Sequence, residues 1–194
     1  MASAFRVRLI SSSASSKAQG TNGTRGFLSL APLGHDDGFR SALTAARTGD
    51  ERALGELYRV VQPRVLRYLR VMHPSAAEQL ASQTWLEIAG ALRDFDDDQQ
   101  ALLAWALAVA HRRARQGARR ASRGGRDAGS GAATSDALAE VAALPRARAE
   151  VLLLRVLGGM SVDEVARVTG RRPRTVRILQ HLALRSLARR GRSR

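Results

Sequence analysis

The residues of this chain best suited to chemistry are arginines that recur along its last helical segment. From Arg171 to Arg194 the sequence holds nine arginines and no acidic residue. Guanidinium groups bind phosphates, and their planar fork of donors can read guanine in the major groove of DNA. At about 100° per residue, one face of a helix in this segment gathers basic side chains. They are Arg174, Arg177, His181 and Arg185. This face predicts contact with DNA, since a solvated face would mix acids with bases.

The elements around this helix predict a helix-turn-helix. The opposite face is apolar, with Ile178 at its edge, and should pack inward. It carries Val176, Leu179, Ala183 and Leu187. Ser161 and Glu164 form a capping box at the start of a short preceding helix. Gly170 is a C-terminal stop, and Pro173 suits the first position of the next helix. The alternative is an ordinary helical hairpin in a bundle.

A second basic run ends an earlier helix, and no acid interrupts it. It comprises Arg112, Arg113, Arg115, Arg119, Arg120, Arg123 and Arg126. The negative end of a helix dipole favours positive charge, which explains one or two of these arginines. A run of seven arginines instead favours a surface that contacts successive phosphates along the DNA backbone. Two such surfaces on one chain predict binding to two separated DNA elements, because tethered contacts reinforce each other.

Composition agrees with a helical, polyanion-binding protein. The net charge is +15, and Lys17 is the only lysine. A genome that prefers arginine codons explains the arginine-over-lysine choice but not the excess of base over acid. The core must rely on Ala, Leu and Val, which favours helices. The chain has no cysteine, which excludes disulfides and thiolate metal sites and fits a cytoplasmic location. No apolar run approaches the roughly 20 residues of a membrane span.

The pattern along the chain predicts an all-α fold of two small helical modules joined by a flexible linker. Apolar residues recur at i, i+3 and i+4 from Arg40 to about Arg120, where Pro63 should kink or interrupt a helix. Ser- and Gly-rich stretches flank this part. The predicted divisions are a disordered extension (1–38), a first module (39–120), the linker (121–136), a second module (137–190) and a basic tail (191–194). The extension also resembles an organelle transit peptide.

In order and spacing, several segments of residues 40–190 resemble sigma factors of the extracytoplasmic-function (ECF) group of the sigma-70 superfamily. Residues 77–86 look like the polymerase-binding segment of their region 2, and residues 105–113 like its −10 promoter helix. Leu57, Tyr58 and residues 63–69 look like the first helix of that region. Residues 144–155, 159–166 and 175–177 look like region 4, which binds the −35 element. The resemblance implies a transcription initiation factor without catalysis or cofactor.

The resemblance also implies partners and site residues. The partners would be promoter DNA and core RNA polymerase, through the β′ clamp helices and the β flap. Members of the group often have an anti-sigma factor, and no membrane partner is implied. The predicted −35 contacts are Arg171, Arg172, Arg174, Thr175, Arg177, Ile178, His181 and Arg185. The predicted −10 contacts are His111, Arg112, Arg113, Arg115, Arg119 and Arg120. The predicted polymerase contacts are Glu78, Gln79, Gln83, Trp85 and Glu87, although Trp85 is equally well explained as core.

Two features depart from the family pattern. Gln79 and Gln83 stand where acidic residues are common, which could weaken polymerase docking. The run from Asp94 to Asp98 is unusually acidic for a loop near DNA, and we interpret it as a solvated loop. It lacks the glycine and spacing of a calcium-binding loop. His181 has no partner ligands nearby, so no metal site is predicted.

Three other functions compete with this interpretation. A free-standing helix-turn-helix regulator would need no polymerase, but it leaves the pattern of the first module unexplained. An enzyme acting on nucleic acid would need a catalytic cluster, whereas the histidines are scattered and no phosphate-binding GxxxxGK[ST] motif occurs. A protein that coats DNA nonspecifically would not need two capped, patterned modules. Sequence discrimination at fixed salt separates these possibilities.

Overall fold

The computed structural model describes residues 35–121 and 136–192. Most of the predicted N-terminal extension and of the predicted linker, and the last two residues of the basic tail, lie outside this part. The described residues form eight α-helices and two short 3-10 helices, with no strand among them. The prediction of an all-α fold is therefore confirmed. None of the described helices is long and apolar enough to cross a membrane.

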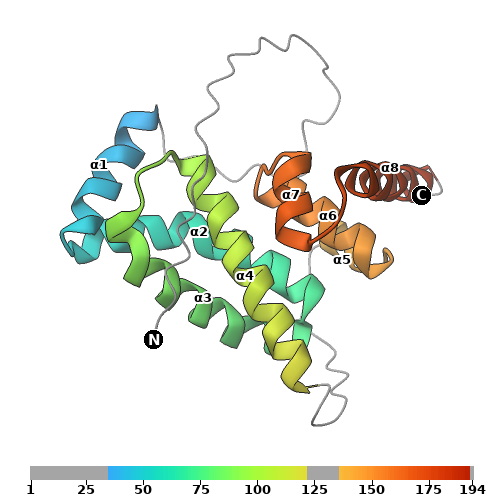
Figure 1. Ribbon diagram of the computed structural model, residues 1–194, viewed down its shortest axis with the longest axis horizontal. Helices are drawn as coiled ribbons and strands as arrows, with labels where there is room; N and C mark the ends of the chain where they lie inside the picture. Colours follow the sequence, from blue (N-terminus) through green and yellow to red (C-terminus); the bar gives the residue numbers. More distant parts are fainter. Residues whose placement is uncertain (1–34, 122–135, 193–194) are drawn as a thin grey trace.

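The N-terminal module consists of the first four α-helices. They are α1 (His35–Arg47), α2 (Glu51–Met72), α3 (Ala77–Ala91) and α4 (Gln99–Ala121), with 3-10 turns at Pro74–Ala76 and Leu92–Asp94. Helix α2 packs against the other three, and α3 packs against α4. Figure 1 shows α2 crossing behind α4 with α3 beside them. The core between them is mostly Leu, Val and Ala, as the composition requires.

Helix α2 continues through Pro63, so this residue does not interrupt the helix, which was one of the two outcomes predicted from the sequence. It is a single helix of 22 residues with Pro63 inside it. A proline inside a helix costs about 3 kcal/mol or more. Val61 and Val65 flank the proline, and each is 1% exposed. Burial of these and other apolar residues of α2 offsets the cost, so packing overrides the local preference.

Helix α1 begins earlier than the predicted module boundary. His35 starts the helix, so the last four residues of the predicted 1–38 extension are helical. The anchors lie just beyond them, where Phe39 and Leu43 are buried one helical turn apart. Gly38 lies within the first turns of α1, and nothing packs against its Cβ position. A glycine on an exposed helical face costs only about 1 kcal/mol, which these anchors offset.

The C-terminal module holds the other four α-helices. They are α5 (Asp136–Ala142), α6 (Arg146–Leu157), α7 (Val162–Thr169) and α8 (Pro173–Gly191). Both hydrogen bonds of the predicted capping box are present at Ser161 and Glu164. Gly170 has a φ of 69°, a left-handed conformation that favours glycine and ends α7. Pro173 is the first residue of α8, as predicted.

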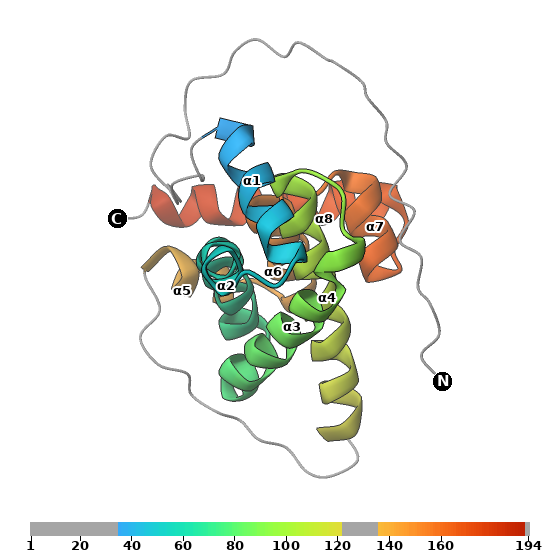
Figure 2. The same ribbon diagram turned by 90° about the vertical axis from the view of Figure 1, so that its left-hand side faces the viewer.

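The two modules pack directly against each other. Helix α6 lies against α2, and both α6 and α7 contact α4. Figures 1 and 2 show α5 to α8 gathered on one side of α2 and α4. The buried apolar residues of both modules form one continuous core. The sequence had predicted two modules held together only by a flexible tether, so this packing was not foreseen.

The close approach of the end of α6 to α4 depends on Gly158. A Cβ atom added to Gly158 would lie 2.9 Å from Cδ1 of Leu107 on α4, and equally close to the carbonyl oxygen of Leu154. The side-chain amide of Gln100 on α4 donates to the Gly158 carbonyl. The end of α6 therefore sits where only a residue without a side chain fits without displacement.

Candidate nucleic-acid interface

The predicted reading face of α8 is exposed, and its apolar face is buried. Val176 and Ala183 are 0% exposed, and Leu179 and Leu187 are half-buried against the core. This orientation turns the basic face to solvent. Its exposed members are Arg172, Arg174, Thr175, Arg177, Ile178, His181 and Arg185. The division of α8 into two faces is as predicted from the sequence.

The described part of the molecule does not neutralise the positive charge of this face. Among the described residues, no ion pair involves Arg172, Arg174, Arg177 or Arg185. Guanidinium groups stay charged at every accessible pH. An exposed helix that presents several unpaired arginines gains free energy when it meets phosphates, because counterions are released.

Arg171 differs from the other predicted −35 contacts. It lies in the turn between α7 and α8 and is half-buried. Its Nη2 is 3.3 Å from a carboxylate oxygen of Glu150 on α6. This ion pair therefore joins the turn of the helix-turn-helix to α6.

The basic end of α4 is partly engaged inside the N-terminal module. Glu87 on α3 forms ion pairs with both Arg112 and Arg113, the latter at 2.7 Å. Arg115 is exposed and forms no ion pair among the described residues. Arg119 and Arg120 lie at the end of α4, but their side chains fall outside the described part, as do Arg123 and Arg126.

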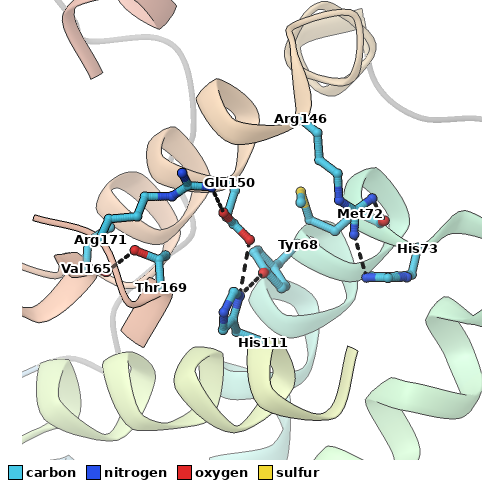
Figure 3. Close-up of polar contacts among 9 residues, drawn as sticks. All are labelled: Tyr68, Met72, His73, His111, Arg146, Glu150, Val165, Thr169 and Arg171. Atoms are coloured by element: carbon cyan, nitrogen blue, oxygen red, sulfur yellow. Dashed lines mark hydrogen bonds and ion pairs between the residues drawn. The ribbon is translucent and has the colours of Figure 1, made fainter. Parts of the chain in front are cut away.

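His111, a predicted −10 contact, is buried where the two modules meet. Its residue is 3% exposed. Its Nδ1 lies 2.9 Å from the hydroxyl of Tyr68 on α2 and 3.4 Å from Glu150 on α6 (Figure 3). It cannot touch DNA while the modules are packed together. The helical period places it on the inward face of α4, beside the buried Leu107 and Ala110.

Burial shapes the ionisation of this cluster. It lowers the pKa of His111 below its usual range, although the nearby Glu150 carboxylate acts in the opposite direction. Burial also raises the pKa of the Tyr68 hydroxyl, and Glu150 adds to that effect. His111 and Tyr68 are therefore both uncharged near neutral pH, and the charges of the cluster are those of Glu150 and Arg171.

Arg146 forms a second polar junction between the modules. From α6 it donates to the main-chain carbonyl of Met72 on α2 at 2.7 Å. It also lies 2.7 Å from Nε2 of His73, as Figure 3 shows. Burial, followed by the positive charge of Arg146, lowers the pKa of His73 to about 4. The ring is therefore neutral at physiological pH and can accept the hydrogen bond.

The predicted polymerase-binding residues share one helix but differ in exposure. Glu78 and Gln79 are exposed on α3, whereas Gln83, Trp85 and Glu87 are half-buried. The Trp85 ring packs edge-on against Tyr58 of α2, with centroids 5.1 Å apart. Trp85 is thus partly exposed and partly packed. This placement is compatible with both roles left open by the sequence, a polymerase contact and a core residue.

Sequence reasoning missed several residues that the structure makes prominent. Leu86 is 71% exposed on α3, beside the predicted polymerase contacts. An apolar side chain exposed to this degree suggests a contact surface when it adjoins other candidates. Glu150, Arg146 and Tyr68 join the modules, but each follows an ordinary helical pattern, so the sequence held no signal for them.

The acidic side chains of the loop between α3 and α4 make local contacts. Asp96 pairs with Arg47 of α1 at 3.0 Å and is largely exposed. Asp98 accepts a hydrogen bond from the main-chain N–H of Ala101 at 2.7 Å, at the start of α4. Within the described ranges, no group of three His, Asp or Glu side chains is placed to hold a metal ion.

Comparison with known proteins covers both modules. A family model described as sigma-70 region 2 matches residues 57–124, and one described as sigma-70 region 4 matches residues 136–187. Similar curated relatives are the ECF RNA polymerase sigma factors SigD of Mycobacterium bovis and Mycobacterium tuberculosis. Each is 29% identical over 174 residues, covering 76% of this chain and 81% of the relative.

A solved structure, that of CnrH in complex with the cytosolic domain of CnrY, shares the fold with a TM-score of 0.52. The identity is 21%, and the match covers 79% of this chain and 97% of that one. Together the two region models match more than half of the chain. The region 2 model covers the N-terminal module with its basic helix α4, and the region 4 model covers the C-terminal module with the exposed basic face of α8. The chain therefore belongs to the sigma-70 family of RNA polymerase sigma factors, within the ECF group.

Proposed function

We propose that this protein directs bacterial core RNA polymerase to specific promoters, with the N-terminal module at the −10 element and the C-terminal module at the −35 element. The observation that carries this assignment is the exposed basic face of α8, the second helix of a helix-turn-helix whose first helix is capped. On this face Arg172, Arg174, Arg177 and Arg185 form no ion pair with any described residue. The protein belongs to a family that is generally non-enzymatic. A free-standing regulator is not favoured, because residues 57–124 match region 2, which such a regulator would not need.

For the −35 element we propose base or phosphate contacts by the exposed side chains at the start and middle of α8. They are Arg172, Arg174, Thr175, Arg177, Ile178, His181 and Arg185. Recognition helices of this type place their N-terminal residues on base edges. Arg174 and Arg177 are the best candidates for reading bases, since they lie in the first two turns and are exposed.

For the −10 element we propose Arg112, Arg113 and Arg115, together with Arg119 and Arg120 further along α4. Two of these arginines already pair with Glu87, so DNA phosphates would have to compete with that carboxylate. Exposed or half-exposed ion pairs are worth at most about 1 kcal/mol, so phosphates can displace them.

Binding both elements at once requires the modules to separate. A compact body of this size has a radius of gyration of roughly 15 Å, hence a diameter of about 40 Å. Elements centred at −10 and −35 lie about 25 base pairs apart, or roughly 85 Å along B-DNA. The packed arrangement cannot span that distance. We therefore propose that it is the free state, and that separation exposes His111 for its predicted role at the −10 element.

The polymerase surface that we propose centres on α3. Glu78 and Gln79 are exposed there, Gln83, Trp85 and Glu87 lie beside them, and Leu86 adds an apolar contact. This surface would meet the β′ clamp helices, and the C-terminal module would lie near the β flap. Because core polymerase and promoter DNA would be its partners, we propose that the protein acts in the cytoplasm. It would lie at the nucleoid when it is part of the holoenzyme.

An anti-sigma partner is also part of the proposal. The solved structure of CnrH, which shares this fold, contains CnrH together with the cytosolic domain of CnrY. A partner that holds the two modules packed together would keep them from spanning a promoter.

Run-off transcription tests the proposal directly. Core polymerase from a GC-rich bacterium is incubated with genomic fragments, with and without the protein, and the 5′ ends of the transcripts are sequenced. We expect discrete start sites that share two upstream motifs and depend on the protein. An Arg174→Ala, Arg177→Ala double variant should lose them, while Arg40→Ala, an exposed arginine on α1, should not. Specific DNA binding without any transcript would support a free-standing regulator instead.

A further inference from the structure

A cavity of about 580 Å³ lies where the two modules meet. Its walls come from three elements: the end of α4, the start of α6, and the turn between α7 and α8. The lining residues are Arg115, Arg146, Ala147, Glu150, Thr169, Gly170 and Arg171. Small-molecule sites in proteins typically have volumes of roughly 300–1,000 Å³. The cavity is therefore large enough for a small ligand.

The lining carries more positive than negative charge. It holds three guanidinium groups and one carboxylate, so its formal charge is positive by two. The carboxylate of Glu150 is already paired with Arg171 at 3.3 Å. The guanidinium of Arg146 meets a carbonyl and an imidazole, neither of which is anionic. Arg115 forms no ion pair among the described residues. Arg115 and Arg146 therefore pair with no carboxylate among the described residues, which leaves two positive charges of the cavity unbalanced there.

One hydrogen-bond donor of a residue that lines the cavity also has no acceptor. Nε of Arg171 is buried and has no hydrogen-bond partner among the described residues. A buried polar group without a partner is unfavourable, because it has lost its hydrogen bonds to water. Arg171 also lines the cavity, and a shift of its side chain toward a ligand there would give this N–H an acceptor. Guanidinium groups match the geometry of phosphate oxygens, which they bind in a bidentate manner.

We infer that this cavity binds a phosphate dianion, either free phosphate or the phosphate of a small nucleotide. Arg115 and Arg146 provide the charge, and Arg171 provides a donor. The ligand would contact both modules, because Arg115 belongs to the N-terminal module and the other two belong to the C-terminal module. Such a ligand binds the packed state better than the separated one, so it stabilises the packed state.

Thermal unfolding of the full chain tests the binding site. Melting temperatures are measured against inorganic phosphate and, separately, against adenosine diphosphate, with ionic strength held constant by NaCl. We expect a saturable rise in Tm. The apparent Kd should weaken by about tenfold or more in Arg115→Gln. Arg59→Gln on α2 removes the same charge from an exposed position away from the cavity and should behave as wild type.

Arg115 is exposed, so its replacement should not affect folding. Tighter binding of the nucleotide would identify the source of the phosphate as a nucleotide, and equal binding would favour free phosphate. Either result supports the site. A titration that is identical in Arg115→Gln and wild type, or equally weakened in Arg59→Gln, would overturn it as general attraction to a basic protein.

A distance measurement tests the link to module packing. The chain has no cysteine, so spin labels can be placed at Ser82→Cys on α3 and Ala188→Cys on α8, both exposed. Phosphate should increase the population at the short distance in the wild-type background and not in Arg115→Gln. An unchanged distribution despite saturable binding would refute the link. Neither experiment involves polymerase or promoter DNA, so its failure would leave the proposed function untouched.

Discussion

Oε1 of Glu150 on α6 lies 3.4 Å from Nδ1 of His111 on α4, so a carboxylate of one module meets a buried imidazole of the other. The other oxygen of the same carboxylate pairs with Arg171 in the helix-turn-helix. One side chain thus connects two residues that the sequence had assigned to two different promoter elements.

Glu150→Gln should destabilise the packed state. The change removes a charge that Arg171 faces, and a buried hydrogen-bonded group that loses its partner costs about 1–3 kcal/mol. Urea unfolding of the variant should show a lower midpoint. Glu56→Gln is the control, because its carboxylate forms only a surface pair with Arg52 at 4.0 Å. Equal stability of the two variants would mean that Glu150 does not hold the modules together.

Stability should fall as the pH drops below about 6.5. Burial holds the pKa of His111 below its usual range and that of His73 at about 4, so the unfolded chain binds more protons in this interval. The stabilising effect is complete above pH 6.5 and is lost as the pH falls toward the folded-state values. The groups facing His111 are Tyr68, Arg115, Arg146, Glu150 and Arg171.

Melting temperatures between pH 7.5 and 5 measure this effect, compared between wild type and a His111→Asn, His73→Asn double variant. The variant should have a flatter profile, because the asparagines do not titrate. A profile as steep as that of wild type would assign the acid sensitivity to other groups.

Arg174→Ala and Arg177→Ala should each weaken binding to a −35-like sequence by roughly 1–3 kcal/mol if they read bases. Fluorescence anisotropy at one fixed salt concentration, with specific and scrambled duplexes, separates the two kinds of contact. A loss confined to the specific duplex indicates base reading. An equal loss on both duplexes would make these arginines phosphate contacts, and Arg40→Ala serves as the charge-matched control.

Leu86→Ser and Glu78→Lys should each weaken binding to a fragment containing the β′ clamp helices by about tenfold, or roughly 1.4 kcal/mol. Leu86 is 71% exposed, so its loss should not affect folding. Leu184→Ser on α8 is the matched control, because Leu184 is 50% exposed on the other module. Unchanged affinity in both test variants would place the polymerase surface elsewhere. Glu87 is a poorer test site, since its charge also holds Arg112 and Arg113.

Gly158→Ala should destabilise the protein by about 1–3 kcal/mol, because a methyl group there meets Leu107 and the Leu154 carbonyl. Gly90→Ala should do the opposite. Gly90 lies within α3 with nothing near its Cβ position, and alanine is favoured over glycine in a helix by about 0.5–1 kcal/mol. Denaturant unfolding of the two variants gives both values. A neutral Gly158→Ala would show that α4 and α6 can move apart without cost.

Local signals in the sequence were sufficient to predict the helices and the turn of the helix-turn-helix. The capping box at Ser161, the stop at Gly170 and the start at Pro173 depend on residues within a few positions, and each is found as expected. The two faces of α8 follow from helical period alone. Pro63 shows the limit of such reasoning, because the burial of α2 outweighs a local preference that depends only on the proline itself.

The contacts between modules could not be predicted in this way. Glu150 and His111 are 39 positions apart, and nothing in the spacing of either residue indicates the other. His111 had been assigned to DNA because residues 105–113 resemble the −10 promoter helix of the family. On a helix, adjacent residues point about 100° apart, so one faces the core while its neighbour faces solvent. The exposure of each residue depends on which helix packs against it.

The exposed face of α8 has a consequence for how promoters are found. The packed molecule presents this face to solvent while His111 stays covered by α6. If α8 contacts DNA as proposed, the packed molecule would bind any duplex through α8 alone and diffuse along it on phosphate contacts, which carry little sequence information. Promoter search and promoter binding would then be separate steps. The packed molecule would scan DNA through the C-terminal module alone, and the N-terminal module would bind only after the two modules separate.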